Sequence, residues 1–522
     1  MFKKIVEFFR VIGDLKYLIP LLRYKFPDPD DNASLAHSFQ ETVNSFSKNN
    51  FIYFENETWT YAETNEAANK LAHKLAEDGI CHSDRVVLFM ENRSDYIISI
   101  LALNKIGAIG VLINTSLTGK PLIHCINSSD SKKCIVGAEL ASSLEDVLDD
   151  INISNKSDIY WVKDGDKFLC PDWASNLKLL LDDSKIENLD MTDMVTAKDT
   201  AFYIFTSGTT GVPKAALFPN SKIIAASINI TKGGYRMDDS DCMYNCLPLY
   251  HSTGLMLGLC ACVQAGAATF IRRKFSASSF WKEAKQFNTT AFVYVGELCR
   301  YLSFQDPSDE EKNNPISKMV GNGLRPDLWD SFRNRFNVER IIEIYGASEG
   351  NALFMNLLNK DETIGMTNAR VGIFEYDVAE DKLVKNEDGK YIEVEENQPG
   401  LLLVEIGPNA IYNGYTDKKA SEEKVITNVF EKGDRWFNTG DLIKTMDVGF
   451  ALGRKHYQFV DRVGDTFRWK AENVSTNEVA EILNLYDQVN MANVYGVKIP
   501  KSEGRAGMVA FNCSLDNFNW EN

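Results

Sequence analysis

Segments with a helical spacing of apolar residues alternate with short apolar runs in the first part of the chain. Residues 68–75 place apolar side chains at three- and four-residue intervals, which predicts an amphipathic helix, and residues 85–90 form an apolar run typical of a buried strand. The succession continues with a predicted helix over 97–105, a strand over 109–113 and a helix over 120–128. This alternation predicts an α/β fold with parallel strands.

The first 26 residues differ in character from the rest. Their apolar residues recur at intervals typical of an amphipathic helix, and they include six basic and two acidic residues. The longest apolar run, residues 17–22, is too short to span a bilayer, which needs about 20 residues. Asp14 and Lys16 would interrupt the apolar core of a signal peptide. The segment is therefore either a terminal helix docked on the body or, as we favour, an interfacial helix on an anionic membrane, which predicts a membrane-associated protein on the cytoplasmic face without a signal peptide.

Composition limits the remaining possibilities. A chain of 522 residues with 44% hydrophobic content can bury more than one core. Its formal net charge of −17 argues against a nucleic-acid partner. The ten cysteines include no Cys-x-x-Cys pair and the six histidines are scattered, so neither a zinc site nor a disulfide framework is supported.

Residues 206–214 have the composition of an anion-binding loop. They read Thr-Ser-Gly-Thr-Thr-Gly-Val-Pro-Lys. Glycines let backbone N–H groups approach anionic oxygens, hydroxyls add donors and the lysine adds a positive charge, so the segment suits a triphosphate, although its spacing is not that of a Walker A loop. For this segment alone, a solvated turn is the alternative. The candidate phosphate-binding residues are Thr206, Ser207, Gly208, Thr209, Thr210, Gly211 and Lys214.

This string resembles the phosphate-binding loop of the adenylate-forming superfamily, which includes acyl-CoA synthetases, luciferases and peptide-synthetase adenylation domains. Four more strings match that superfamily in its order, namely Leu-Pro-Leu-Tyr-His-Ser-Thr-Gly at 247–254, Tyr-Gly-Ala-Ser-Glu-Gly-Asn at 345–351, Asn-Thr-Gly-Asp-Leu at 438–442 and Asp-Arg-Val-Gly-Asp-Thr-Phe-Arg-Trp-Lys at 461–470. The last string, together with Gly-Asn-Gly-Leu-Arg-Pro at 321–326, is similar to the branch of very-long-chain acyl-CoA synthetases, also called fatty acid transport proteins.

The resemblance implies how the nucleotide is held. Tyr345 would stack on adenine, and a core aromatic at the end of a strand is its alternative role. Asp441 would accept hydrogen bonds from the ribose hydroxyls, and Ser348 stands where relatives more often have threonine. The candidate nucleotide-binding residues outside the loop are Gly321, Asn322, Gly323, Tyr345, Gly346, Ser348, Asp441 and Arg462.

The resemblance also implies the reaction and its other ligands. Thr206 and Glu349 would hold Mg²⁺, and His251 would lie beside the acyl carboxylate unless it is a structural histidine. Arg468 and Lys470 suit the phosphates of CoA. The alternative is that these two basic residues only form part of a solvated surface, which would give the same sequence pattern. The candidate catalytic residues are Thr206, Lys214, His251, Glu349 and Arg462.

The implied function is an ATP-dependent long-chain or very-long-chain fatty acid–CoA ligase that forms an acyl-adenylate and then a thioester. Two alternatives are a membrane-associated fatty acid binding or transport protein with impaired catalysis, and an adenylating ligase for another carboxylic acid.

The implied fold has a large multi-sheet amino-terminal domain and a small α+β carboxyl-terminal domain. We expect a membrane-associating segment over 1–26, the large domain over 27–461 and a mobile domain over 462–522 that turns near Gly464. Relatives carry a catalytic lysine near the end of the small domain, and no Phe-Lys-x-Arg-Lys-like segment follows Gly507. We therefore expect this domain to be incomplete, because the sequence is a fragment or because the lineage has lost adenylation power.

Overall fold

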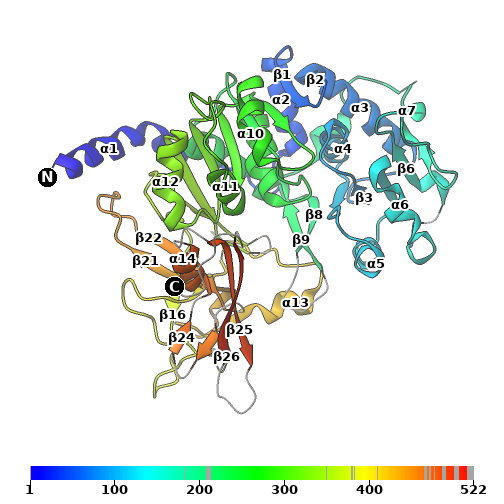
Figure 1. Ribbon diagram of the computed structural model, residues 1–522. Helices are drawn as coiled ribbons and strands as arrows, with labels where there is room; N and C mark the ends of the chain where they lie inside the picture. Colours follow the sequence, from blue (N-terminus) through cyan, green and yellow to red (C-terminus); the bar gives the residue numbers. More distant parts are fainter. Residues whose placement is uncertain are drawn as a thin grey trace.

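Two large, mostly parallel sheets and a smaller antiparallel sheet form most of the protein (Figure 1). The computed structural model describes residues 2–153, 155–182, 184–206, 213–347, 350–377, 380, 382–407, 410–463, 467–469, 472–474, 476–484, 489–498 and 505–513.

The first large sheet has the strand order β7-β6-β5-β3-β4-β8-β9 and is parallel except at β9. Its strands are β3 (Arg85–Phe89), β4 (Ile109–Leu112), β5 (Lys133–Gly137), β6 (Ile159–Val162), β7 (Ser175–Asn176), β8 (Thr200–Thr206) and β9 (Lys214–Pro219).

The second large sheet has the order β15-β14-β13-β12-β10-β11-β1-β2 and is parallel except at its two edges. Its strands are β1 (Asn50–Phe54), β2 (Glu57–Thr60), β10 (Cys242–Asn245), β11 (Ala268–Ile271), β12 (Ala291–Val295), β13 (Lys318–Asn322), β14 (Arg340–Tyr345) and β15 (Phe354–Met355).

The remaining strands pair antiparallel. The third sheet contains β16 (Val371–Phe374), β19 (Gly400–Glu405), β20 (Val425–Thr427), β21 (Arg435–Met446) and β22 (His456–Arg462). Three two-stranded ribbons are β17 (Tyr376–Asp377) with β18 (Lys382–Leu383), β23 (Phe467–Trp469) with β24 (Glu472–Val474), and β25 (Val489–Lys498) with β26 (Arg505–Cys513).

Helices separate and cover the two large sheets. Helix α2 contacts α3, α4, α8 and α9, so these five form a layer between the sheets. In Figure 1, α10, α11 and α12 lie on the other face of the second sheet. The helices are α1 (Phe2–Arg23), α2 (Leu35–Phe46), α3 (Tyr61–Glu77), α4 (Ser94–Lys105), α5 (Gly119–Ser128), α6 (Ala141–Glu145), α7 (Leu177–Leu180), α8 (Asn220–Ile228), α9 (Cys260–Ala265), α10 (Ala277–Gln286), α11 (Gly296–Ser303), α12 (Pro326–Phe336), α13 (Lys418–Glu423) and α14 (Thr476–Asn484), with π-helical segments η5 (Asn229–Tyr235) and η6 (Thr253–Leu259).

Strand β3 shows why this layering follows from the sequence. Val86 and Leu88 face the core shared by the two sheets, whereas Val87 and Phe89 face a second core on the opposite side of the first sheet. A strand buried on both faces must be apolar at every position, because successive side chains point to opposite faces. The predicted α/β fold with parallel strands is therefore confirmed.

Helix α1 is the amphipathic helix predicted from the sequence, and one of its faces is docked on the body of the protein. Val11, Leu18 and Leu21 are buried. Buried Asp14 accepts a hydrogen bond of 2.5 Å from Arg236. The opposite face is exposed, so the helix docks without burying all its apolar residues. No helix in the described ranges is both long and apolar enough to cross a bilayer.

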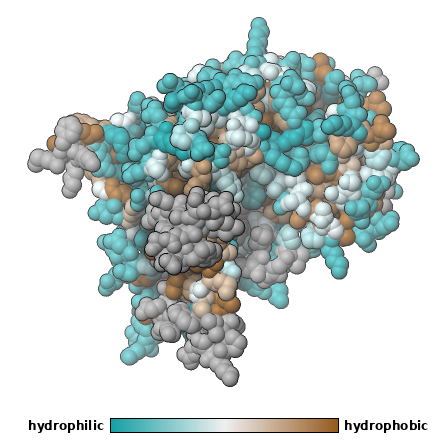
Figure 2. Space-filling view, in the orientation of Figure 1, coloured by the Kyte–Doolittle hydropathy of each residue, from teal (hydrophilic) through white to brown (hydrophobic). Residues whose placement is uncertain are grey.

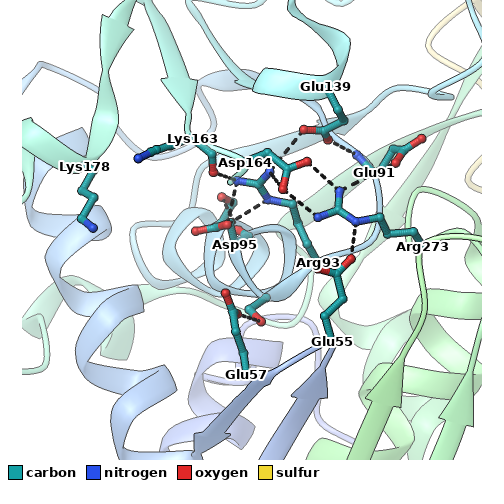
Figure 3. A network of polar contacts seen from close by, with 12 residues as sticks. Glu55, Glu57, Glu91, Arg93, Asp95, Glu139, Lys163, Asp164, Lys178 and Arg273 are labelled. Carbon is teal, nitrogen blue, oxygen red and sulfur yellow. Dashed lines mark hydrogen bonds and ion pairs between the residues drawn. The ribbon is translucent and has the colours of Figure 1, made fainter. Parts of the chain in front are cut away.

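An ionic network joins the two large sheets, because Asp164 pairs with Arg93 at 3.5 Å as well as with Arg273 (Figure 3). Arg93, at the start of α4, has a side chain only 2% exposed and donates hydrogen bonds to Asp95, Glu139 and the carbonyl of Lys163. Arg273, which follows β11 of the other sheet, makes two hydrogen bonds with Asp164, at 2.7 and 2.9 Å. The network fixes the position of one sheet against the other.

A second buried carboxylate fixes the ends of three neighbouring strands. Glu343 on β14 accepts hydrogen bonds from the Tyr294 hydroxyl at 2.6 Å and from the backbone N–H groups of Gly323 and Leu324 at 2.9 and 2.8 Å. Burial raises the pKa of Glu343 from 4.5 to about 7. Buried Cys299 on α11 also faces this carboxylate, and burial raises the pKa of its thiol well above the usual range. Glu343 thereby holds the turn after β13 against β12 and β14.

Replacement of Arg93 by methionine should lower the free energy of unfolding by about 3 kcal/mol, because it removes the hydrogen bonds of a buried guanidinium and leaves partly buried carboxylates without their cation. Chemical denaturation measures the change. The matched control is Lys198→Met, which breaks the exposed pair with Asp30 and should change the free energy of unfolding far less. Equal losses in the two variants would show that the network does not stabilise the fold.

The raised pKa of Glu343 predicts a pH-dependent contribution to stability. The folded protein keeps this proton up to about pH 7, whereas the unfolded chain releases it near 4.5, so the contribution is present at low pH and is lost as the pH rises through 7. The difference in unfolding free energy between wild type and Glu343→Gln should change by up to about 3 kcal/mol between these limits. Denaturation midpoints measured across this range provide the test, and parallel profiles for the two proteins would contradict it.

Candidate functional site

A cavity of about 2600 Å³ lies where residues of all three sheets meet. Its lining includes nine residues that the sequence identified, namely Thr206, Lys214, His251, Asn322, Gly323, Tyr345, Gly346, Asp441 and Arg462. They come from segments more than 250 residues apart in the chain. The fold therefore brings the predicted site residues that it describes to one place, with the exceptions given below.

The ends of the phosphate-loop candidate are placed by an antiparallel hairpin. Thr206 ends β8 and pairs directly with Lys214, which begins β9. The Thr206 hydroxyl oxygen is buried and has no hydrogen-bond partner among the described residues. The Lys214 ammonium lies 5.9 Å from the centre of the Tyr415 ring. Both ends of the loop therefore line the cavity.

Several candidates lie outside the described residues. These are Ser207, Gly208, Thr209, Thr210, Gly211, Ser348, Glu349 and Lys470. Arg468 lies on β23, but its side chain is not among those described. Their proposed contacts stay predictions from the sequence.

Tyr345 and Asp441 meet at the cavity wall. The Tyr345 hydroxyl donates a hydrogen bond of 2.5 Å to an Asp441 carboxylate oxygen. Burial and the charge of Asp441 raise the pKa of Tyr345 well above its usual range. The ring also packs edge-on against Phe354, with centroids 5.4 Å apart, so Tyr345 belongs to a local core as well as to the cavity wall.

A tight turn in β21 directs Asp441 toward the cavity. Gly440 has a φ of +74°, a conformation that other residues rarely adopt. The Asn438 side chain accepts the Gly440 N–H at 2.9 Å, and the Thr439 hydroxyl accepts the Asp441 N–H at 3.1 Å. The side chains before Asp441 thus satisfy the backbone of the turn and leave the carboxylate available to line the cavity.

The turn after β13 forms another part of the wall. Asn322 and Gly323 line the cavity, and Gly323 has a φ of +81°. Gly321 is not among the lining residues. It lies on β13, where a Cβ atom would come within 2.0 Å of the Tyr294 carbonyl oxygen, so its glycine is required by close strand packing.

His251 lies between β10 and η6, exposed to the cavity. Desolvation by the surrounding residues lowers the pKa of the His251 imidazole. A neutral imidazole can donate one hydrogen bond without adding charge. The adjacent backbone is tightly folded, because a Cβ atom at Gly254 would come within 2.6 Å of the Pro248 carbonyl oxygen.

Arg462 ends β22 and stands at the edge of the cavity. Its side chain is 73% exposed, and its Nε lies 3.7 Å from a carboxylate oxygen of Asp441. The preceding Asp461 is buried and accepts the backbone N–H of Thr476, the first residue of α14, at 2.8 Å. This bond ties the end of β22 to α14.

The described residues that could contact a metal are few. No group of three His, Cys, Asp or Glu side chains suited to a metal ion occurs within the described part of the chain. The unpartnered Thr206 hydroxyl is compatible with Mg²⁺, which prefers oxygen ligands and commonly keeps several waters and substrate phosphates. Its predicted partner, Glu349, lies outside the described residues.

Glu343 and Asp461 position the site, although no motif in the sequence assigned them this role. Glu343 is the one charged residue in the apolar string Ile-Ile-Glu-Ile at 341–344, and such an interruption could have drawn attention to it. No sequence pattern around Asp461 indicates its role, because it caps α14 only when Thr476 folds back against it.

Comparisons with known proteins agree with the geometry. Residues 39–416 match the family described as AMP-binding enzyme. The chain is 37% identical to the medium/long-chain-fatty-acid–CoA ligase FadD6 of Mycobacterium tuberculosis, over 92% of this chain and 78% of that protein. It is 35% identical to long-chain fatty acid transport protein 6 of Mus musculus, over 98% of this chain and 82% of that protein.

The crystal structure of the anthranilate CoA ligase AuaEII in complex with anthranoyl-AMP shares the fold, with a TM-score of 0.75 at 15% identity over 94% of this chain and 88% of that one. The predicted large multi-sheet architecture is thereby confirmed. The family match over residues 39–416 and the two relatives confirm the predicted resemblance to the adenylate-forming superfamily. This chain belongs to the AMP-binding enzyme family.

Proposed function

We propose that this protein is an ATP-dependent fatty acid–CoA ligase acting on long acyl chains. The main support for this function is that a single set of residues lines one cavity. They are Thr206, Lys214, His251 and the hydrogen-bonded pair of Tyr345 and Asp441. The two relatives named for medium- or long-chain fatty acids support this substrate class.

In the first step, the cavity would hold ATP and the fatty acid together. Adenine would lie against Tyr345 and the turn held by Glu343, and Asp441 would accept hydrogen bonds from the ribose. An oxygen of the fatty carboxylate attacks the α-phosphorus, and the bond to the departing pyrophosphate breaks. Neutral His251 would donate a hydrogen bond to the carboxylate and so orient it.

Charge neutralisation is the main task of the chain in this step. Two anions must approach each other in a protein with a net charge of −17, so Lys214 and Arg462 would supply local positive charge. Thr206 and Glu349 would hold Mg²⁺. That ion, when bound, neutralises developing charge on the phosphates.

In the second step, the CoA sulfur attacks the acyl carbonyl and AMP leaves. The segment after Arg462 would move over the acyl-adenylate, and Arg468 and Lys470 would bind the CoA phosphates. Such a movement would have to break the bond between Asp461 and Thr476. We propose that the domain boundary lies between residues 461 and 462 and that the mobile domain turns near Gly464.

We also place the protein at an anionic membrane surface. The first 26 residues carry a net charge of +4, from six basic and two acidic residues, and α1 leaves an apolar face exposed. A substrate that partitions into lipid favours this location.

The proposal predicts both half-reactions. With ATP, Mg²⁺ and palmitate, pyrophosphate should be released and hydroxylamine should trap palmitoyl hydroxamate. With pre-formed palmitoyl-adenylate, CoA should yield palmitoyl-CoA without ATP. Omission of palmitate is the control for ATP hydrolysis. Absence of both hydroxamate and thioester, in protein that is folded by circular dichroism, would refute the ligase function.

Asp441→Asn should weaken ATP binding about tenfold, because hydrogen bonds to a charged acceptor are roughly twice as strong as those to a neutral one. Isothermal titration calorimetry with ATP measures the change. Asp388→Asn makes the same replacement on the exposed surface and serves as control. If both variants bind ATP like the wild type, Asp441 does not contact the nucleotide.

A further inference from the structure

The exposed face of α1 carries an apolar stripe that Lys16 interrupts. Its members lie along one side of the helix at intervals of three or four residues, with one interval of seven residues across Lys16, and Figure 2 shows hydrophobic surface on the part that projects from the body. The stripe consists of Ile5, Phe9, Ile12, Ile19 and Leu22, each at least 39% exposed, and leads to Phe26. Water contact with these side chains is unfavourable, so the stripe fits an apolar partner.

The charges of α1 favour an anionic bilayer as that partner. The two acidic residues of the segment, Glu7 and Asp14, are both paired with cations of the body, Lys360 and Arg236. Exposed Lys16 lies between Ile12 and Ile19 of the stripe, and exposed Arg23 follows Leu22. Docking therefore neutralises the acids and leaves the outer face of the helix cationic.

The stripe continues into the cavity. Leu22 is 70% exposed and Phe26 37% exposed, yet both line the cavity that holds the proposed nucleotide site. Ile19, one turn before Leu22, is 40% exposed and does not line it. Leu22 and Phe26 thus face both the outside of the protein and its interior.

Helix α8 and η5 form another part of the cavity wall. Ala225 and Asn229 line the cavity there, and α1 packs against the same elements through Leu21 and Ile228. Deeper residues of the lining, Ile230, Met256 and Leu257, are buried and apolar. The lining therefore includes apolar residues from the exposed end of α1 to the segment that follows His251.

We propose that the gap between the end of α1 and α8 is the portal through which an acyl chain passes from an anionic phospholipid bilayer into the cavity. The stripe docks on the membrane and Leu22 and Phe26 form the outer lip. The acyl chain then moves from lipid to protein without crossing water, which avoids the hydration of its methylene groups. This inference rests on the proposed fatty acid ligase function.

The portal is tested with Leu22→Asp and its matched control Ile19→Asp. Both replace an exposed apolar residue of the stripe by a carboxylate, but only Leu22 lines the cavity. The association rate of the fluorescent fatty acid cis-parinarate is measured by stopped-flow in the absence of vesicles. Leu22→Asp should slow it about tenfold, because the carboxylate repels the anionic ligand and replaces apolar surface at the lip. Ile19→Asp should keep the wild-type rate.

A variant on the other wall makes the test independent of α1. Ala225→Trp should narrow the gap and slow association of cis-parinarate in the same way, while calorimetry shows unchanged AMP affinity in all three variants. Both stripe variants should bind vesicles containing one quarter phosphatidylglycerol less well than the wild type does, and the wild type should not bind vesicles of phosphatidylcholine alone.

The outcomes separate the portal from the proposed function. Wild-type association rates in both Leu22→Asp and Ala225→Trp would overturn the portal while leaving the ligase function in place. Equal binding of the wild type to anionic and neutral vesicles would overturn the anionic bilayer as the partner. Failure of the wild-type protein to bind AMP and cis-parinarate at all would contradict the ligase function, and the portal with it.

Discussion

Parallel pairing of strands is the constraint on which the site depends. Successive parallel strands begin at one edge of a sheet and end at the other, so residues that follow them gather at a common rim. In the second sheet this rule places His251 after β10, Asn322 at the end of β13 and Tyr345 at the end of β14. The β8–β9 hairpin of the first sheet supplies Thr206 and Lys214 at the same cavity. A nucleotide and a carboxylic acid bound there would contact segments that no local motif joins.

The carboxylates of Glu343 and Asp441 have different roles in this arrangement. Glu343 is buried and accepts three hydrogen bonds, so it fixes backbone that borders the cavity. Asp441 lies at the cavity wall, where it accepts a hydrogen bond from Tyr345 and lies near Arg462. The helix-capping Asp461 forms a third contact, one that depends on the position of α14. The site thus combines rigid support with one connection that a conformational change could break.

The sequence predicted those parts of the fold that depend on local periodicity. The buried alternation of β3 and the amphipathic spacing of α3 and α1 were sufficient, because burial on both faces or on one face imposes a regular apolar pattern. The motifs likewise identified Thr206, Lys214, Tyr345 and Asp441 as neighbours. The ionic network of Arg93 and Arg273 could not be predicted, since it joins side chains from two sheets whose packing no local pattern encodes. For α1, the sequence left docking and membrane contact as alternatives, whereas the structure docks one face of the helix and leaves the other exposed.

The proposed function requires that one cavity binds the nucleotide and the acyl chain at the same time. Calorimetric titration with palmitoyl-sulfamoyladenosine, a stable analogue of palmitoyl-adenylate, tests it without requiring turnover, and sulfamoyladenosine lacking the acyl chain is the reference. Burial of the chain beside a bound nucleotide should make the analogue bind at least about a hundredfold more tightly than the reference, since each buried methylene contributes up to about 0.8 kcal/mol. Equal affinities of the two compounds would contradict the account, because the nucleotide site would then have no acyl site connected to it.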